Sequence, residues 1–182
     1  QLEAGAHLVG HSYGGVISLL AAARRPDAVR SLTVIEPPAF AGARGHAAAD
    51  AFVELAERHW RESPREPRAF LAGFLAAVGS SVPLPDPLPP ALLRGAEMLI
   101  VERGSQEAEI PLAALREAGF PTLVVSGGHD PAFDAVCDVL ERELRAERAV
   151  LPGAGHAAQR APGFNEVLER FLLDAEGRRS WL

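Results

Sequence analysis

The sequence predicts an α/β fold, built on a parallel sheet with helices on its faces and carrying one long helical insertion. Three observations predict it. Short apolar segments typical of strands alternate with helical patterns along the chain. The clearest strand candidates are apolar on both faces, as strands of a parallel sheet covered by helices must be. The segment Pro37–Phe120 is far longer than one crossover helix requires, which indicates an insertion.

The composition is that of a globular protein that buries a core. Of its 182 residues, 48% are hydrophobic and 23% are charged. The formal net charge of −6 and the absence of lysine argue against a nucleic-acid partner, since phosphate contacts need clustered cations. No apolar run reaches the roughly 20 residues that cross a bilayer, so no membrane partner is expected. The single cysteine, Cys137, excludes an internal disulfide and favours a reducing, cytoplasmic location.

The expected elements follow one another in the order that such a sheet requires. The chain opens on a strand at Ala6–Val9 and continues into a helix from about Gly14 to Arg25. That helix is apolar nearly all round, so we expect it inside the molecule, and Pro26 ends it. Further strands are expected at Ser31–Ile35, Pro121–Ser126 and Arg148–Leu151, with helices at Ala132–Arg145 and Phe164–Asp174.

The insertion has helical patterns of its own. They lie at Phe52–Trp60, Phe70–Val78 and Leu92–Val101, and the proline-rich segment Ser80–Pro90 should be an extended linker between them. We expect residues 39–118 to form a helical lid over a core made of residues 1–38 and 119–182. The alternative is a helical decoration with no role at a site.

The segment Gly10-His11-Ser12-Tyr13-Gly14 carries the strongest chemical signal. Gly-x-Ser-x-Gly alone is weak, but here it lies between a short apolar strand and a buried helix, where a nucleophile elbow belongs. Glycines at positions 10 and 14 would allow the tight turn, and the helix would direct its free N–H groups at the reaction centre. The alternative is a surface turn that carries the pattern by chance.

A base and an acid are expected at the same edge of the sheet. Asp130 and His156 each follow a predicted strand, and the order Ser, Asp, His is the one that this arrangement needs. Asp130 could instead cap the next helix, and His156 could be an ordinary loop histidine. Glu36, at the end of the second predicted strand, is the alternative acid.

We expect the other histidines and the cysteine to have structural roles. His11 belongs to the elbow and should pack there, and His129 should point away because it adjoins Asp130 in a tight turn. We expect Cys137 to be a small buried thiol. His7, His46 and His59 lack a partner pattern. No metal and no organic cofactor is implied.

Together, Gly10–Gly15, Ser126-Gly127-Gly128-His129-Asp130 and Gly153-Ala154-Gly155-His156 resemble the motifs of the α/β-hydrolase superfamily, particularly its lidded bacterial members. The resemblance implies Ser12 as nucleophile, His156 as base and Asp130 as acid. It also implies the Tyr13 backbone N–H as an oxyanion donor. The expected activity is hydrolysis of a small ester or related acyl substrate through an acyl-enzyme.

The resemblance also implies something about the N-terminal part of the chain. In this superfamily about a hundred residues precede the elbow, at roughly 30 residues per strand-helix unit. Only eleven precede Ser12 here. We therefore expect the N-terminal half of the sheet and a second oxyanion donor to be missing, and the edge near Ala6–Val9 to self-associate. The alternative function is a non-catalytic or ligand-binding protein on the same fold.

Overall fold

The computed structural model describes residues 5–80 and 82–179, and it contains one parallel sheet. The strands are β1 (Ala6–His11), β2 (Val29–Ile35), β3 (Thr122–Ser126) and β4 (Glu147–Val150). They lie in the order β1-β2-β3-β4, and each neighbouring pair is parallel. The predicted α/β fold is confirmed, and all four expected strands form.

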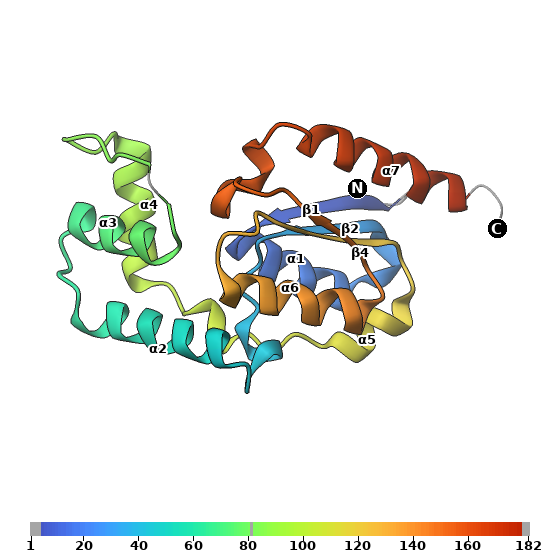
Figure 1. The fold of residues 1–182 in the computed structure, drawn as a ribbon, viewed down its shortest axis with the longest axis horizontal. Helices are drawn as coiled ribbons and strands as arrows, with labels where there is room; N and C mark the ends of the chain where they lie inside the picture. Colours follow the sequence, from blue (N-terminus) through green and yellow to red (C-terminus); the bar gives the residue numbers. More distant parts are fainter. Residues whose placement is uncertain (1–4, 81, 180–182) are drawn as a thin grey trace.

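Helices cover both faces of this sheet (Figure 1). Helices α1 (Tyr13–Arg24), α5 (Leu112–Ala118) and α6 (Pro131–Leu144) lie on one side, and α7 (Phe164–Arg179) lies on the other. Short 3₁₀ turns precede β2 at Pro26–Ala28 and follow β4 at Gly155–Arg160. All crossovers between parallel strands therefore run through helices, as parallel pairing requires.

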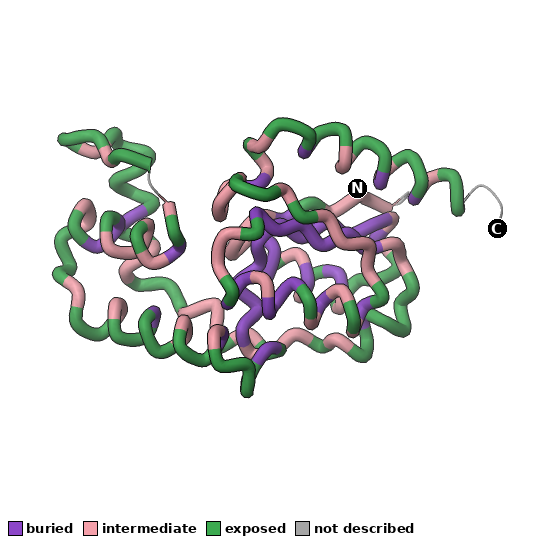
Figure 2. The backbone as a smooth tube through the Cα atoms, in the orientation of Figure 1, coloured by how far each residue is buried: buried purple, intermediate pink, exposed green. Residues whose placement is uncertain are grey.

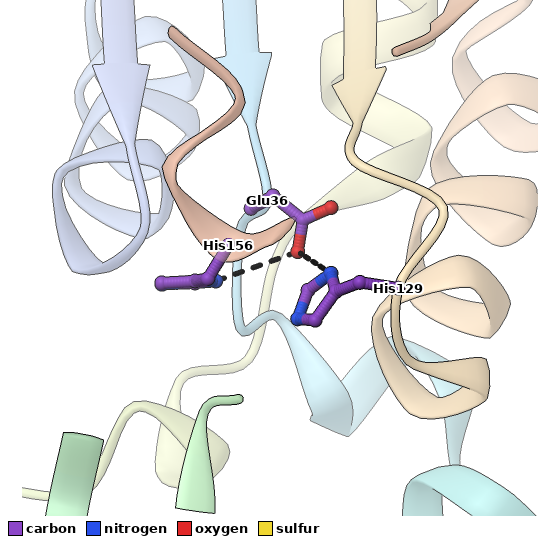
Figure 3. A group of neighbouring side chains, drawn as sticks. All are labelled: Glu36, His129 and His156. Atoms are coloured by element: carbon purple, nitrogen blue, oxygen red, sulfur yellow. Dashed lines mark hydrogen bonds and ion pairs between the residues drawn. The ribbon is translucent and has the colours of Figure 1, made fainter. Parts of the chain in front are cut away.

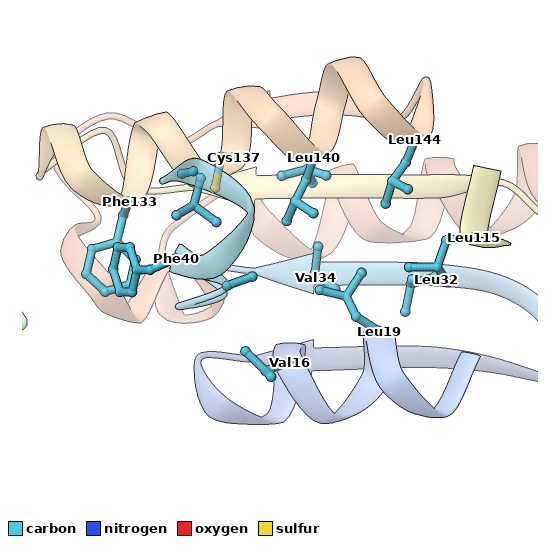
Figure 4. Packing of buried hydrophobic residues seen from close by; sticks show 14 of the residues in the cluster. Val16, Leu19, Leu32, Val34, Phe40, Leu115, Phe133, Cys137, Leu140 and Leu144 are labelled. Carbon is cyan, nitrogen blue, oxygen red and sulfur yellow. The ribbon is translucent and has the colours of Figure 1, made fainter. Parts of the chain in front are cut away.

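The core divides into two layers because side chains alternate across each strand. Leu32 and Val34 of β2 pack with α1 and α6 in one cluster, and Figure 4 shows Leu140 and Leu144 of α6 above them. Ile35, Leu123 and Val125 point to the other face and pack with Phe171 of α7. The strands in the middle of the sheet are thus covered on both sides, which explains their continuous apolar sequence.

The segment between β2 and β3 is helical, as expected. It contains a 3₁₀ turn at Phe40–Ala43, then α2 (Ala47–Glu62), α3 (Pro67–Ala77) and α4 (Pro90–Val101), and a second 3₁₀ turn at Ser105–Glu107. Figure 1 shows α2, α3 and α4 beside the sheet, and Figure 2 shows that they are more exposed than the strands. Val82–Pro89, the described part of the proline-rich segment between α3 and α4, forms no helix or strand; Ser81 lies outside the described residues.

Helix α5 differs from its expected place. We expected residues 39–118 to form the insertion, and α5 lies within that range. It nevertheless packs against α1 and α6 of the sheet layer. Leu115 of α5 is fully part of the main core. The helical part of the insertion that lies beside the sheet therefore consists of α2, α3 and α4.

The outer side of β1 has no neighbouring strand among the described residues, because β1 pairs with β2 alone. Two large apolar side chains are exposed there or nearby: Val9 of β1 at 46% and Ile17 of α1 at 54%. The expectation that α1 lies inside on all sides is therefore wrong for its outer face. None of the described helices combines the length and apolar character that a membrane span needs.

Candidate active site

Ser12 stands on a strained turn between β1 and α1. Its φ of 52° and ψ of −127° are unusual for a residue with a side chain, and such conformations persist only where the surroundings enforce them. A Cβ at position 10 would lie 2.4 Å from the Gly14 carbonyl oxygen, so glycine is required there. The expectation for Gly14 fails, since a Cβ at that position would meet nothing within 4 Å.

Two of the backbone N–H groups in the turn around Ser12 donate hydrogen bonds within the protein. The Ser12 N–H donates to the Ile35 carbonyl oxygen at 2.8 Å, and the Gly15 N–H donates to the Ser12 carbonyl oxygen at 2.8 Å. Tyr13 begins α1, so its N–H has no acceptor within the helix and lies at the positive end of the helix dipole. This is the donor that the sequence predicts.

His156 faces Ser12 from the loop after β4. Its Nε2 lies 2.9 Å from the Ser12 Oγ, a distance at which the hydroxyl donates to an unprotonated nitrogen. The His156 side chain is 11% exposed. The expected nucleophile and base are therefore in contact, although they lie 144 residues apart in sequence.

His11 steadies this loop, in line with its structural interpretation. Its Nε2 donates to the backbone carbonyl oxygen of His156 at 2.7 Å, and the two rings lie 5.0 Å apart. Burial lowers the pKa of His11, against the opposing effect of that hydrogen bond. The neutral form that burial favours still supplies the N–H for this bond.

The carboxylate nearest to His156 belongs to Glu36, at the end of β2 (Figure 3). Glu36 is fully buried, and its Oε2 lies 3.4 Å from His156 Nδ1. Its Oε1 accepts a 2.6 Å hydrogen bond from the Gly127 N–H, which fixes the orientation of the carboxylate. Glu36 also has a positive φ of 49°, a second strained residue at the same sheet edge.

Asp130, the preferred acid from sequence, occupies a different role. It is the N-cap of α6, and its Oδ1 accepts a 2.7 Å hydrogen bond from the Ala132 N–H. Pro131 follows as the first residue of the helix and has no N–H of its own to satisfy. No hydrogen bond or ion pair joins Asp130 to His156 within the described residues, so the geometry favours the alternative acid, Glu36.

His129 also departs from its expectation. Instead of pointing away, its ring turns towards Glu36, with Nδ1 3.5 Å from Glu36 Oε2 and a side chain that is 13% exposed (Figure 3). The ring lies 5.7 Å from that of Phe133 on α6. Sequence reasoning missed this residue because the direction of a side chain in a glycine-rich turn depends on contacts that lie far away in sequence.

The contacts and exposure of His7, His46, His59 and Cys137 are consistent with structural roles. His7 contacts the Ser31 Oγ at 2.8 Å, and His59 contacts the Ser63 Oγ at 2.6 Å and the Phe70 carbonyl oxygen at 3.1 Å. His46 is exposed. Cys137 is buried, and this burial raises the pKa of its thiol to about 12, so it is an inert core residue.

A cavity opens between Ser12 and the helices of the insertion. The space inside it that the centre of a water molecule can occupy is about 70 Å³. Its wall is mainly apolar, formed by Pro38, Phe40, Phe52, Val53, Ala56, Trp60, Phe74, Ala77, Val78, Leu99 and Phe133. The lining also includes the polar residues Ser12, Tyr13, Glu102, Arg103, Ser105 and Gln106. Such a cavity suits an apolar group with a polar reacting end.

Known proteins resemble this chain in sequence and in fold. A curated relative from Enterobacter sp. (strain 638), 2-succinyl-6-hydroxy-2,4-cyclohexadiene-1-carboxylate synthase, is 32% identical over 161 residues. The match covers 84% of this chain and 60% of the relative, so the chain spans less than two thirds of the relative's length.

Solved structures give the same picture. An alpha/beta hydrolase from Sphaerobacter thermophilus DSM 20745 is 27% identical with a TM-score of 0.60, covering 92% of this chain and 67% of that one. NosK from Streptomyces actuosus is 26% identical with a TM-score of 0.59, covering 96% and 73%. A bacterial membrane phospholipase A shares the fold at 24% identity and a TM-score of 0.66, covering 94% and 58%.

The family profile described as "Alpha/beta hydrolase family" matches residues 1–165, which is most of the sequence. The four-stranded parallel sheet and the contact between Ser12 and His156 agree with this match. The chain belongs to the alpha/beta hydrolase family.

Proposed function

We propose that the chain is a serine hydrolase of a small ester or related acyl substrate, with Ser12 as nucleophile, His156 as base and Glu36 as the orienting acid. The observation that carries this proposal is the 2.9 Å contact between His156 Nε2 and Ser12 Oγ on a strained elbow. A nucleophile within hydrogen-bond reach of its base, and a base within reach of a third group, is the arrangement that activates a serine.

The chemistry follows from these positions. His156 Nε2 takes the proton of the Ser12 hydroxyl as Oγ attacks the substrate carbonyl carbon. The Tyr13 N–H donates to the oxygen that becomes negative. The protonated His156 then gives its proton to the leaving alcohol, and a water molecule attacks the acyl-enzyme by the same route in reverse. Glu36 keeps the Nδ1–H tautomer of His156, which leaves Nε2 free to accept.

The cavity wall supports an apolar acyl group as the part of the substrate that is bound. Among the residues that the structure describes, Arg103 is the only cation on the lining, and its side chain is 84% exposed and paired with Glu107 at 2.7 Å. Glu102 adds a negative charge beside it. The relative's name denotes a carboxylate-bearing ring compound. Because Glu107 already pairs with Arg103, the lining offers no unpaired cation to a substrate carboxylate. It therefore favours an uncharged acyl group in this chain.

Hydrolysis of p-nitrophenyl esters, from acetate to octanoate, tests the proposal. We expect turnover that rises with acyl length while the chain still fits the cavity, and a loss of at least about 10³-fold in Ser12→Ala. Ser12→Ala removes a single oxygen atom from a half-buried turn, so circular dichroism should show an unchanged fold. Equal rates for the two proteins would overturn the proposal and would leave a ligand-binding role for the same cavity.

A further inference from the structure

The side chains of Glu36, His129 and His156 form a compact group at the end of β2 and the two loops beside it (Figure 3). We propose that this group is an inhibitory site for a divalent transition-metal ion, with Zn²⁺ as the best fit. The inhibitory part of the proposal rests on the proposed function. The binding part does not.

The distances between the three side chains are long for charge-assisted hydrogen bonds and also fit the spacing of metal ligands. Glu36 Oε2 lies 3.4 Å from His156 Nδ1 and 3.5 Å from His129 Nδ1. Charge-assisted hydrogen bonds between such groups are about 2.7–2.9 Å long. Two ligand atoms on a tetrahedral zinc, each bonded at about 2.0–2.2 Å, lie about 3.3–3.5 Å apart. One ligand atom from each residue falls within 4.8 Å of the others.

The hydrogen-bonding state of His129 is a second observation, and for Nε2 it does not depend on the distance to Glu36. Both of its ring nitrogens are buried, and neither has a hydrogen-bond partner among the described residues. A buried polar atom without a partner is costly, so such atoms usually have one that is not yet accounted for. A metal ion shared with Glu36 would satisfy one of the two nitrogens.

The surroundings hold these ligands in place. The Gly127 N–H fixes Glu36 Oε1 and leaves Oε2 directed at both histidines. The His129 ring lies against Phe133 on one side, and a Cβ at Gly79, after α3, would lie 3.1 Å from its Cδ2. Supporting contacts of this kind orient metal ligands and raise affinity. Imidazole and carboxylate are also the ligand types that zinc prefers in proteins.

Metal binding would disable the proposed base. An ion on His156 Nδ1 occupies the position of the proton on that nitrogen, so the single proton of the neutral ring moves through solvent from Nδ1 to Nε2. Nε2–H then donates to Ser12 Oγ and can no longer accept from it. One N–H bond breaks and one forms, with no other covalent change, and removal of the ion by a chelator restores the Nδ1–H tautomer.

The binding test is calorimetric titration of the chelator-treated full chain with ZnCl₂. We expect one ion per chain in the wild type, and an affinity at least about 10-fold lower in His129→Phe, which keeps a ring against Phe133. His129→Gln is a second variant in case the larger ring disturbs the fold, and thermal melting checks both. His46→Gln, which removes an exposed histidine outside the group, is the matched control and should bind as the wild type does.

The inhibition test measures ester turnover at the same zinc concentrations, each variant relative to its own metal-free rate. We expect wild-type and His46→Gln turnover to fall as the site fills and to recover with EDTA, and His129→Phe to need at least about 10-fold more zinc. Specific binding without any esterase activity would refute the proposed function and leave the metal site standing. Turnover with no zinc binding, or with binding unchanged in both His129 variants, would overturn the metal site alone.

Discussion

At the residue scale, the carboxylate that faces His156 comes from the end of β2 and not from the end of β3. Both Glu36 and Asp130 lie at the carboxyl edge of the sheet, where the sequence predicts them. Their roles depend on side-chain direction, which strand order does not determine. Asp130 has a local partner in the N–H of Ala132, whereas Glu36 is bonded to Gly127 and faces His156.

Two conservative substitutions separate these carboxylates. We expect Glu36→Gln to lower kcat/KM by about 10²–10⁴-fold, because an amide no longer holds the productive imidazole tautomer. Asp130→Asn should have little effect, since asparagine caps helices as well as aspartate does. The measurement is ester hydrolysis at neutral pH, with thermal melting to exclude unfolding. A larger loss in Asp130→Asn than in Glu36→Gln would assign the acid to Asp130.

At the scale of elements, strands and long helices were predictable because their apolar periodicity is strong. The expected strand Ser31–Ile35 lies within β2 (Val29–Ile35), and the expected helix Phe52–Trp60 lies within α2. The short α5 was missed, since seven residues span too few turns to show a period. Its position against α1 and α6 is likewise set by packing between distant segments and not by local sequence.

Helix α2 presents neighbouring residues to two different environments, which allows a matched test of the cavity. Ala56 is buried and lines the cavity, while Leu55 is 47% exposed and is not part of the lining. Ala56→Phe should reduce kcat/KM for octanoate at least about 10-fold more than for acetate, because the added ring fills space that a long acyl group needs.

The control for that substitution is Leu55→Phe, which adds a ring on the same helix outside the cavity. It should leave the ratio of octanoate to acetate kcat/KM within about two-fold of the wild type, since surface substitutions act weakly. The same change in selectivity in both variants, or in neither, would contradict the assignment of this cavity to the acyl group.

At the scale of the whole molecule, the alternation of strands and helices was sufficient to predict the fold, and strand order predicted the sheet edge at which Ser12, Glu36 and His156 lie. What sequence could not predict was the contact between segments. Glu36 faces His156 and His129 from the end of β2, and the His129 ring lies near both Phe133 and Gly79. These contacts join separate parts of the chain.

The outer edge of the sheet is the other feature that belongs to the whole molecule. β1 has an open side within the described residues, and Val9 and Ile17 are exposed near it. Apolar edges of this kind favour strand pairing between chains. Self-association through Ala6–Val9 therefore stays a prediction. It is independent of the proposed chemistry, because Ser12 and His156 lie at the carboxyl ends of the strands.

The central claim is that His156 activates Ser12 as a nucleophile, and reaction with a fluorophosphonate probe tests it most directly. Such a probe phosphonylates an activated serine and leaves ordinary hydroxyls unmodified. Mass spectrometry of the labelled chain should locate one adduct on the peptide that contains Ser12, with labelling abolished in Ser12→Ala and strongly slowed in His156→Gln. Unchanged labelling of the Ser12→Ala variant, or an adduct on another residue, would contradict the claim.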